Sequence, residues 1–178
     1  MDKWQEDLCD SSLAINSIKN TIENMLDAQI ISLENKNNEI AQILDVYAGI
    51  DYLVKTDNGL KGMATRVQYR NAYNSFTVRL HRTTGTKTEQ EKRINNINNN
   101  YIYPYYTLQA YFENKNNLNL LSLAIINTQQ LYNEILNNSK VVIRNNNKDN
   151  NKFNVIFWKD IKTQGFFKIL ESHQFKLF

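Results

Sequence analysis

The segment GIDYLVKTDNGLKGMATRVQYR, residues 49–70, contains the clearest fold signal in this sequence. Polar and apolar residues alternate on both sides of Asn58 and Gly59, and an Asn-Gly pair between two such runs is typical of a two-residue β-hairpin loop. With these two residues as the loop, Asp51 lies opposite Arg66 and Leu53 lies opposite Ala64. The segment therefore predicts a β-hairpin paired in that register.

One face of the predicted hairpin is polar. Because side chains alternate along a strand, this register gives one face to Asp51, Arg66, Gln68 and Arg70, and gives the other face to apolar residues: Ile50, Tyr52, Val54, Val67 and Tyr69. A charge beside apolar strands is costly unless it is paired, hydrogen-bonded or bound to a metal ion. The polar face is therefore the candidate functional site.

The flanking sequence predicts a mixed α/β protein in one domain, residues 1–178. Apolar residues at three- and four-residue steps predict a long helix within 4–30, and a second helix within 37–49 that Gly49 ends. After the hairpin we expect a third strand at 75–82, then a helix to about Ile97 that begins at a capping box, formed by Thr86 and Glu89 or by Thr88 and Glu91. Further expected elements are strands at 28–34, 106–113 and 120–128, a helix at 128–139, a hairpin from 140–145 and 152–159, and a closing segment at 165–178. This order predicts a central mixed sheet flanked by helices, with extra C-terminal strands.

Composition excludes some classes of protein. With 178 residues and 42% hydrophobic content, the chain can bury one substantial core. The single Cys9 cannot form an internal disulfide, the N-terminal segment lacks the apolar core of a secretion signal, and no apolar run approaches a membrane span. We therefore expect a cytoplasmic protein of a bacterial or phage-infected cell. A net charge of +3 is compatible with a basic face but does not by itself predict nucleic-acid binding.

The motifs GID, ending at Asp51, and QYR, residues 68–70, lie on consecutive predicted strands. This layout resembles the PD-(D/E)XK, or restriction-endonuclease-like, nuclease superfamily, whose core runs helix, three strands, helix, strand (αβββαβ). The resemblance covers roughly residues 10–125. It implies a metal-dependent nuclease in which Asp51 is the first acidic residue, and Gln68 and Arg70 stand at the second acidic position and the lysine position. Arg70 cannot accept a proton as a lysine can, although it can still stabilise a phosphate.

The resemblance also implies a Mg²⁺ or Mn²⁺ site for phosphodiester hydrolysis. Asp51 and Gln68 would bind the ion and Glu39 would complete the site, with Glu23 and Asp45 as alternatives to Glu39. DNA or RNA phosphates would contact arginines and a lysine on the neighbouring elements: Arg66, Arg79, Lys92 and Arg93.

Three other interpretations stay open. Asp51 could form a purely structural ion pair with Arg66 across the hairpin, an interaction of about 0.2–1 kcal/mol. The nuclease-like fold could be retained for nucleic-acid binding alone. The third interpretation is a non-enzymatic phage or mobile-element protein that binds a protein partner and inhibits a host defence complex, which the compact, Asn-rich chain and the degenerate tripeptide would suit.

Overall fold

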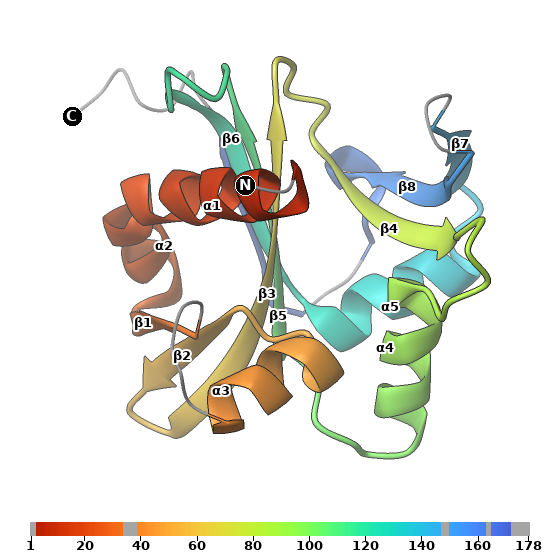
Figure 1. Cartoon of the computed structure of the whole chain (residues 1–178), viewed down its shortest axis with the longest axis horizontal. Coiled ribbons are helices and arrows are strands. Elements are labelled where there is room, and N and C mark those ends of the chain that lie inside the picture. Colours follow the sequence, from red (N-terminus) through yellow and green to blue (C-terminus); the bar gives the residue numbers. More distant parts are fainter. Residues whose placement is uncertain (1–2, 34–38, 147–149, 163–164, 172–178) are drawn as a thin grey trace.

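A computed structural model describes residues 3–33, 39–146, 150–162 and 165–171. The predicted α/β class is confirmed: helices flank a six-stranded mixed sheet, and a second, three-stranded sheet packs beside it (Figure 1). The strand order of the central sheet is β1-β2-β3-β5-β6-β9, and that of the second sheet is β4-β8-β7. Strands β3 and β5 are parallel, whereas the other paired strands are antiparallel.

The bounds of the strands agree with the sequence pattern. The central sheet contains β1 (Gln29–Ser32), β2 (Tyr52–Thr56), β3 (Gly59–Tyr69), β5 (Tyr106–Phe112), β6 (Leu120–Asn127) and β9 (Phe167–Glu171). The second sheet contains β4 (Ser75–His81), β7 (Val142–Asn145) and β8 (Lys152–Phe157). The expected third strand is therefore present as β4, but it pairs with β8 and not with a strand of the central sheet.

The first helix is divided in two. We expected one long helix, and the structure has α1 (Lys3–Ser17) and α2 (Lys19–Leu26), separated at Ile18. The hydroxyl of Ser17 donates a 2.7 Å hydrogen bond to the carbonyl of Ala14. A serine that bonds back to the preceding turn competes with the helical backbone and bends it, which accounts for the break.

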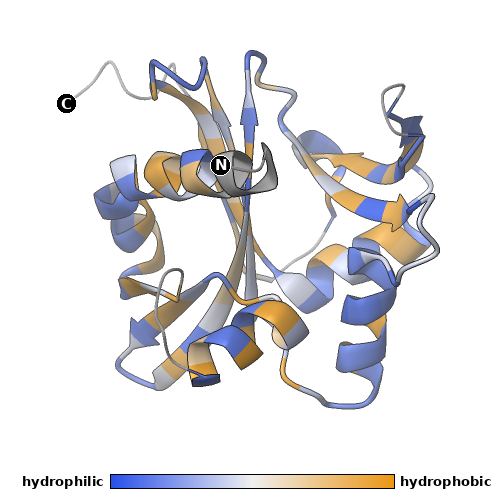
Figure 2. Ribbon diagram, viewed as in Figure 1, coloured by the Kyte–Doolittle hydropathy of each residue, from blue (hydrophilic) through white to orange (hydrophobic). Residues whose placement is uncertain are grey.

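Each face of the central sheet has its own apolar core (Figures 1 and 2). Helices α1 and α2 cover one face, where they pack on residues of β2, β3, β5 and β6 such as Tyr52, Met63, Leu108 and Leu123. The other face is covered by α5 (Thr128–Asn137) and by the inner side of the second sheet, through residues such as Phe76, Ile156 and Leu131.

Three further helical segments complete the fold. Helix α3 (Glu39–Ile43) continues into a π-helical turn, η1 (Leu44–Ala48), which Gly49 ends with a φ of +61°. Helix α4 (Glu89–Asn98) begins at the second of the two predicted capping boxes: the Thr88 hydroxyl accepts from the Glu91 N–H, and the Glu91 carboxylate accepts from the Thr88 N–H. The short 3₁₀ turn η2 (Trp158–Asp160) follows β8.

The β2–β3 hairpin is confirmed, but its predicted register is wrong. Gly59 pairs with Thr56, and Leu53 lies opposite Gly62, whereas we expected Ala64. The loop residues are thus Asp57 and Asn58, and the register differs from the prediction by two residues. A two-residue shift leaves every side chain on its expected face. The register therefore does not explain why the Asp51 carboxylate bonds to Thr65, whose side chain lies on the other face of β3.

Candidate functional site

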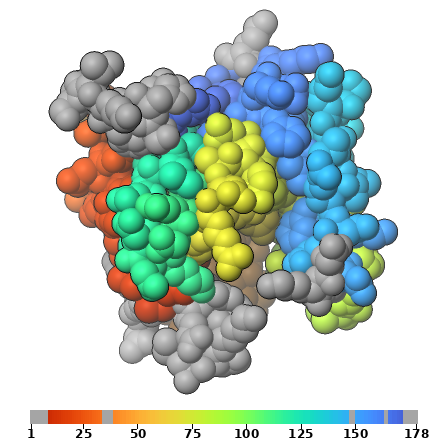
Figure 3. Space-filling model, turned by 90° about the horizontal axis from the view of Figure 1, so that it is seen from above, coloured from red at the N-terminus to blue at the C-terminus, as the bar shows by residue number. Residues whose placement is uncertain are grey.

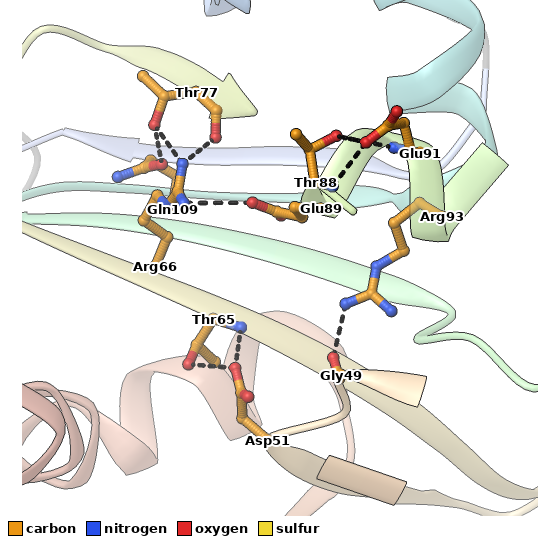
Figure 4. A network of polar contacts seen from close by, with 10 residues as sticks. All are labelled: Gly49, Asp51, Thr65, Arg66, Thr77, Thr88, Glu89, Glu91, Arg93 and Gln109. Atoms are coloured by element: carbon orange, nitrogen blue, oxygen red, sulfur yellow. Dashed lines mark hydrogen bonds and ion pairs between the residues drawn. The ribbon is translucent and has the colours of Figure 1, made fainter. Parts of the chain in front are cut away.

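The carboxylate of Asp51 turns to β3 at the point where the β2–β3 ladder ends (Figure 4). Its Oδ2 atom accepts hydrogen bonds from the backbone N–H of Thr65, at 2.6 Å, and from the Thr65 hydroxyl, at 2.9 Å. Asp51 precedes the first residue of β2, so its carboxylate serves as the acceptor for an N–H that β2 does not reach. The cost of a charge near the core is therefore offset by hydrogen bonds.

Arg66 points to the opposite side of β3 from Asp51 (Figure 4). Its Nη1 atom donates to the carbonyl of Thr77 at 2.5 Å and to the Thr77 hydroxyl at 3.1 Å, and its Nη2 atom lies 3.2 Å from the Glu89 carboxylate. The alternative of a structural Asp51–Arg66 ion pair is therefore wrong. The reason is that the Asp51 carboxylate accepts hydrogen bonds from Thr65, whose side chain lies on the face of β3 opposite to Arg66.

The predicted metal ligands do not form a common site. Gln68 lines a groove on the Arg66 side of β3, whereas the Asp51 carboxylate lies on the Thr65 side. Glu39 is exposed at the first residue of α3. Across the described residues, no cluster of three or more His, Cys, Asp or Glu side chains is arranged to hold a metal ion. The donors present thus do not fit Mg²⁺ or Mn²⁺ in the way the resemblance implies.

The alternative third ligands are also placed elsewhere. Glu23 accepts a 2.9 Å hydrogen bond from the Ile30 N–H and lies 3.8 Å from the Lys19 ammonium. Asp45 lies on η1, where partial burial raises the pKa of its carboxyl. Neither residue is part of a carboxylate cluster within the described chain.

Arg70 lies directly after β3 in a left-handed conformation, with a φ of +89°. Its backbone N–H donates to the carbonyls of Phe112 and Glu113, and its side chain is exposed. Arg70 therefore ends the strand and does not continue the face that Arg66 and Gln68 share.

Arg93 is a structural residue, so its predicted contact with nucleic acid is wrong. Its side chain is buried, with 7% exposed, and its guanidinium donates to the carbonyls of Ala48 and Gly49 at the end of η1. Figure 4 shows the bond to Gly49. The Nη2–Gly49 distance is 2.6 Å. A cation at this end of a helix satisfies carbonyls that have no helical partner. Lys92, by contrast, is exposed on α4.

A groove of about 560 Å³ lies between β3 and the second sheet. Both the segment around residue 75 and the β7–β8 region line this groove. Figure 3 shows the two side by side, the first in yellow and the second in blue. The residues that line this groove are mainly aromatic, amide and hydroxyl side chains with one arginine: Gln68, Tyr73, Ser75, Thr77, Arg144, Asn145, Asn146, Phe153, Val155 and Phe157. We call it the β3–β8 groove.

Two arginines flank one aromatic ring across the second sheet. Arg79 of β4 and Arg144 of β7 are both in register with Phe153 of β8, so the three side chains share the face of the sheet that borders the groove. The Arg79 guanidinium carbon lies 5.4 Å from the centre of the Phe153 ring, and that of Arg66 lies 5.8 Å from it. Guanidinium groups beside an aromatic ring offer both phosphate contacts and stacking surfaces.

The wall of the groove is fixed to the central sheet by Tyr111. The Tyr111 hydroxyl donates to the carbonyl of Ser75 at 2.7 Å and lies 3.0 Å from the Ser75 hydroxyl. Burial raises the pKa of the Tyr111 phenol, which therefore stays protonated and able to donate. This contact fixes the start of β4 over β5.

Sequence reasoning found two of the basic residues at this site and missed the rest. The guanidinium groups of Arg66 and Arg79 lie beside the ring of Phe153, which lines the groove, and their contact with phosphate stays a prediction. Phe153, Arg144 and Tyr73 were missed, because they meet only through the pairing of β8 with β4 and with β7 and the approach of these strands to β3. The alternation in residues 152–157 was a usable signal for the strand, although not for its partner.

Comparisons with known proteins identify no relative: no family model, no curated protein and no solved structure matches this chain. Within the described residues, no helix is long and apolar enough to cross a membrane.

Proposed function

We propose that this protein binds single-stranded nucleic acid in the β3–β8 groove and does not cleave it. The observation that carries the proposal is the row formed by Arg79, Phe153 and Arg144 across the second sheet. Single-strand binding sites combine cationic side chains, which contact the backbone phosphates, with aromatic rings on which bases stack. The groove has both, and Gln68 and Asn145 add amide N–H groups that can donate to phosphate and sugar oxygens.

The charge distribution supports the same ligand. Neighbouring strands lie about 4.8 Å apart, so Arg79 and Arg144 are about 10 Å apart at their backbones, with Phe153 between them. Phosphates on either side of a base stacked near Phe153 would thus each be within reach of a guanidinium. Such contacts involve the phosphates and the flat faces of the bases, which all nucleotides share, so we expect little sequence preference.

The positions of the oxygen ligands do not favour phosphodiester hydrolysis. Metal-assisted phosphodiester cleavage needs oxygen ligands gathered around one ion. Asp51 is hydrogen-bonded to Thr65, and Gln68 faces the groove on the other side of β3. The position equivalent to the superfamily lysine is Arg70, whose guanidinium stays protonated and cannot act as a base.

Fluorescence anisotropy with a labelled oligonucleotide of about 12 nucleotides tests the proposal. We expect wild-type protein to bind and Arg144→Gln to bind more weakly, with a salt dependence whose slope falls by about 0.7. Lys55→Gln is the matched control, since Lys55 is exposed on β2, opposite Leu60 at the far end of β3 from Gln68. Equal affinities for wild type, Arg144→Gln and Lys55→Gln would contradict the proposed site.

A second candidate function is the binding of a protein partner, such as a component of a host defence complex. It is favoured by an exposed apolar patch on α3, η1 and the segment after α4, which surrounds a cavity of about 570 Å³. Its large exposed residues are Ile40, Ile43, Val46, Tyr47, Tyr101 and Ile102. Exposed apolar patches of this kind often mark protein interfaces.

Affinity capture from a host lysate separates the two candidates. A stoichiometric protein partner that Arg144→Gln retains and Tyr47→Glu loses would favour the second candidate, because Tyr47 lines the cavity and is exposed. A partner lost with Arg144→Gln, or captured only through nucleic acid that nuclease treatment removes, would oppose it.

A further inference from the structure

The two terminal nitrogens of the Arg66 guanidinium have different partners beside the β3–β8 groove: Thr77 and the Glu89 carboxylate. Its Nη1 atom donates twice to Thr77, to the carbonyl and to the hydroxyl, whereas its Nη2 atom pairs with Glu89 (Figure 4). Thr77 lines the groove, and so does Phe153, whose ring lies 5.8 Å from the Arg66 guanidinium carbon. The contact with Thr77 holds the guanidinium at the groove regardless of what pairs with Nη2.

The Arg66–Glu89 pair is partly open to solvent. The side chains of Arg66 and Glu89 are 26% and 30% exposed, and the two atoms are 3.2 Å apart. Ion pairs at this degree of exposure contribute little to stability, and an anion in solution can compete for the cation. The Glu89 carboxylate thus occupies a position on Arg66 that a phosphate oxygen could take, because a guanidinium binds both groups in the same way.

Release of Glu89 from Arg66 leaves the carboxylate in a favourable place. Glu89 is the first residue of α4, directly after the Thr88 cap. A negative charge in the first turn of a helix is stabilised by the unpaired N–H groups there, whether or not Arg66 is nearby. The exchange of Glu89 for a phosphate therefore requires no unfolding of α4.

We propose that Arg66 is a phosphate-binding residue of the groove and that Glu89 is its internal competitor, which lowers the affinity for nucleic acid. This inference rests on the proposed function. Glu89 then weakens the binding of any anionic ligand at Arg66, because the incoming phosphate has to replace the Glu89 carboxylate at Nη2.

The test is a double-mutant cycle on oligonucleotide affinity, measured by anisotropy at low salt. Glu89→Gln should tighten binding about two- to five-fold, which is the range expected from releasing a partly exposed ion pair. Glu91→Gln is the matched control: it removes the same charge from the same turn, and glutamine can still complete the capping box. The control should change affinity by less than Glu89→Gln does.

The decisive step repeats Glu89→Gln in an Arg66→Gln background. We expect Arg66→Gln to weaken binding and Glu89→Gln to give no further gain beyond that of Glu91→Gln, since the competition needs Arg66. Arg66→Met, which keeps the apolar stem of the side chain without its charge, replaces Arg66→Gln if the latter does not fold by circular dichroism.

Each other outcome overturns the inference. An equal gain from Glu89→Gln with and without Arg66 would indicate only the general charge of the surface, and no gain in wild type would mean that Glu89 does not compete. In both cases the nucleic-acid function would stand, because wild type still binds. Wild-type protein that binds no oligonucleotide would overturn the proposed function and this inference together.

Discussion

The carboxylate of Asp51 and the guanidinium of Arg66 lie on opposite sides of strand β3, where one bonds to Thr65 and the other to Thr77 and Glu89 (Figure 4). The register predicted from the sequence places this carboxylate and this guanidinium together on one face of the hairpin, whereas in the structure they have different partners. Asp51 completes the end of the β2–β3 ladder, while Arg66 joins the central sheet to the second sheet and to α4. This separation leads to different predictions for the two residues.

Replacing Asp51 should weaken the fold and leave binding intact. Asp51→Ala removes two hydrogen bonds to a carboxylate and leaves the Thr65 N–H without that acceptor. We expect the free energy of unfolding to fall by about 1.5–3 kcal/mol, measured by urea denaturation. Asp57→Asn, in the exposed hairpin turn, is the control and should change stability by less than about 0.5 kcal/mol. A folded Asp51→Ala protein that no longer binds oligonucleotide would argue for a direct role of Asp51 in the site.

Arg93 should be important for stability because it joins α4 to the end of η1. Arg93→Ala removes donors from the carbonyls of Ala48 and Gly49 and leaves a buried space, and we expect a loss of about 2–4 kcal/mol in urea denaturation. Lys92→Ala, the exposed neighbour on the same helix, should have little effect. Similar stabilities for the two variants would show that the buried contact is unimportant.

Gly49→Ala tests the same contact from the other side. An added Cβ would lie 2.6 Å from the Arg93 Nη2 atom, and the φ of +61° is unfavourable for alanine. We expect the substitution to lower the free energy of unfolding by at least about 1 kcal/mol. Combined with Arg93→Ala, the loss should be smaller than the sum of the two single losses, because the steric conflict disappears. Strict additivity would contradict the close approach.

The capping box predicts a dependence of stability on pH. Hydrogen bonds from the Thr88 backbone and side chain lower the pKa of Glu91 in the folded protein. The stabilisation from the charged carboxylate is therefore complete above the unfolded pKa, which is about 4.3, and is lost as the pH falls through the lower folded value. Denaturation of wild type and Glu91→Gln across acidic pH should show a stability difference that shrinks below that range. A difference independent of pH would mean that the Glu91 charge is not involved.

Phe153 should contribute to binding through its ring. Stacking of a base on an aromatic side chain is worth about 1–3 kcal/mol, so we expect Phe153→Leu to weaken single-strand binding measurably in anisotropy titrations. Tyr101→Leu is the control, since Tyr101 is exposed outside the groove. The loss should be greater for a single strand than for a duplex, whose bases are already stacked. Equal effects of Phe153→Leu on both ligands would contradict stacking in the groove.

Much of the fold could be predicted because it depends on local patterns. The strand alternation, the capping box at Thr88 and the stop at Gly49 each act within a few residues, and the structure confirms them. The break at Ile18 was missed because it depends on the rotamer of Ser17, whose hydroxyl bonds back to Ala14. The hairpin register was wrong by two residues because more than one loop position suits the residues 57–59.

The site was less predictable because it depends on pairing between distant segments. Arg79 and Phe153 meet only through the β4–β8 pairing, which no local pattern specifies. Arg93 had a usable signal that was overlooked. Its spacing from Gln90 and Ile97 places it on the inward face of α4, and a charged residue on such a face usually has buried partners.

Incubation of an end-labelled single strand with the protein, in Mg²⁺ or Mn²⁺ and in EDTA, is the most direct test of binding without cleavage. We predict a retarded complex under both conditions, abolished or weakened by Arg144→Gln, from which the strand is recovered at full length. Metal-dependent shortening of the strand that Asp51→Ala abolishes would contradict the proposal, and so would the absence of any complex.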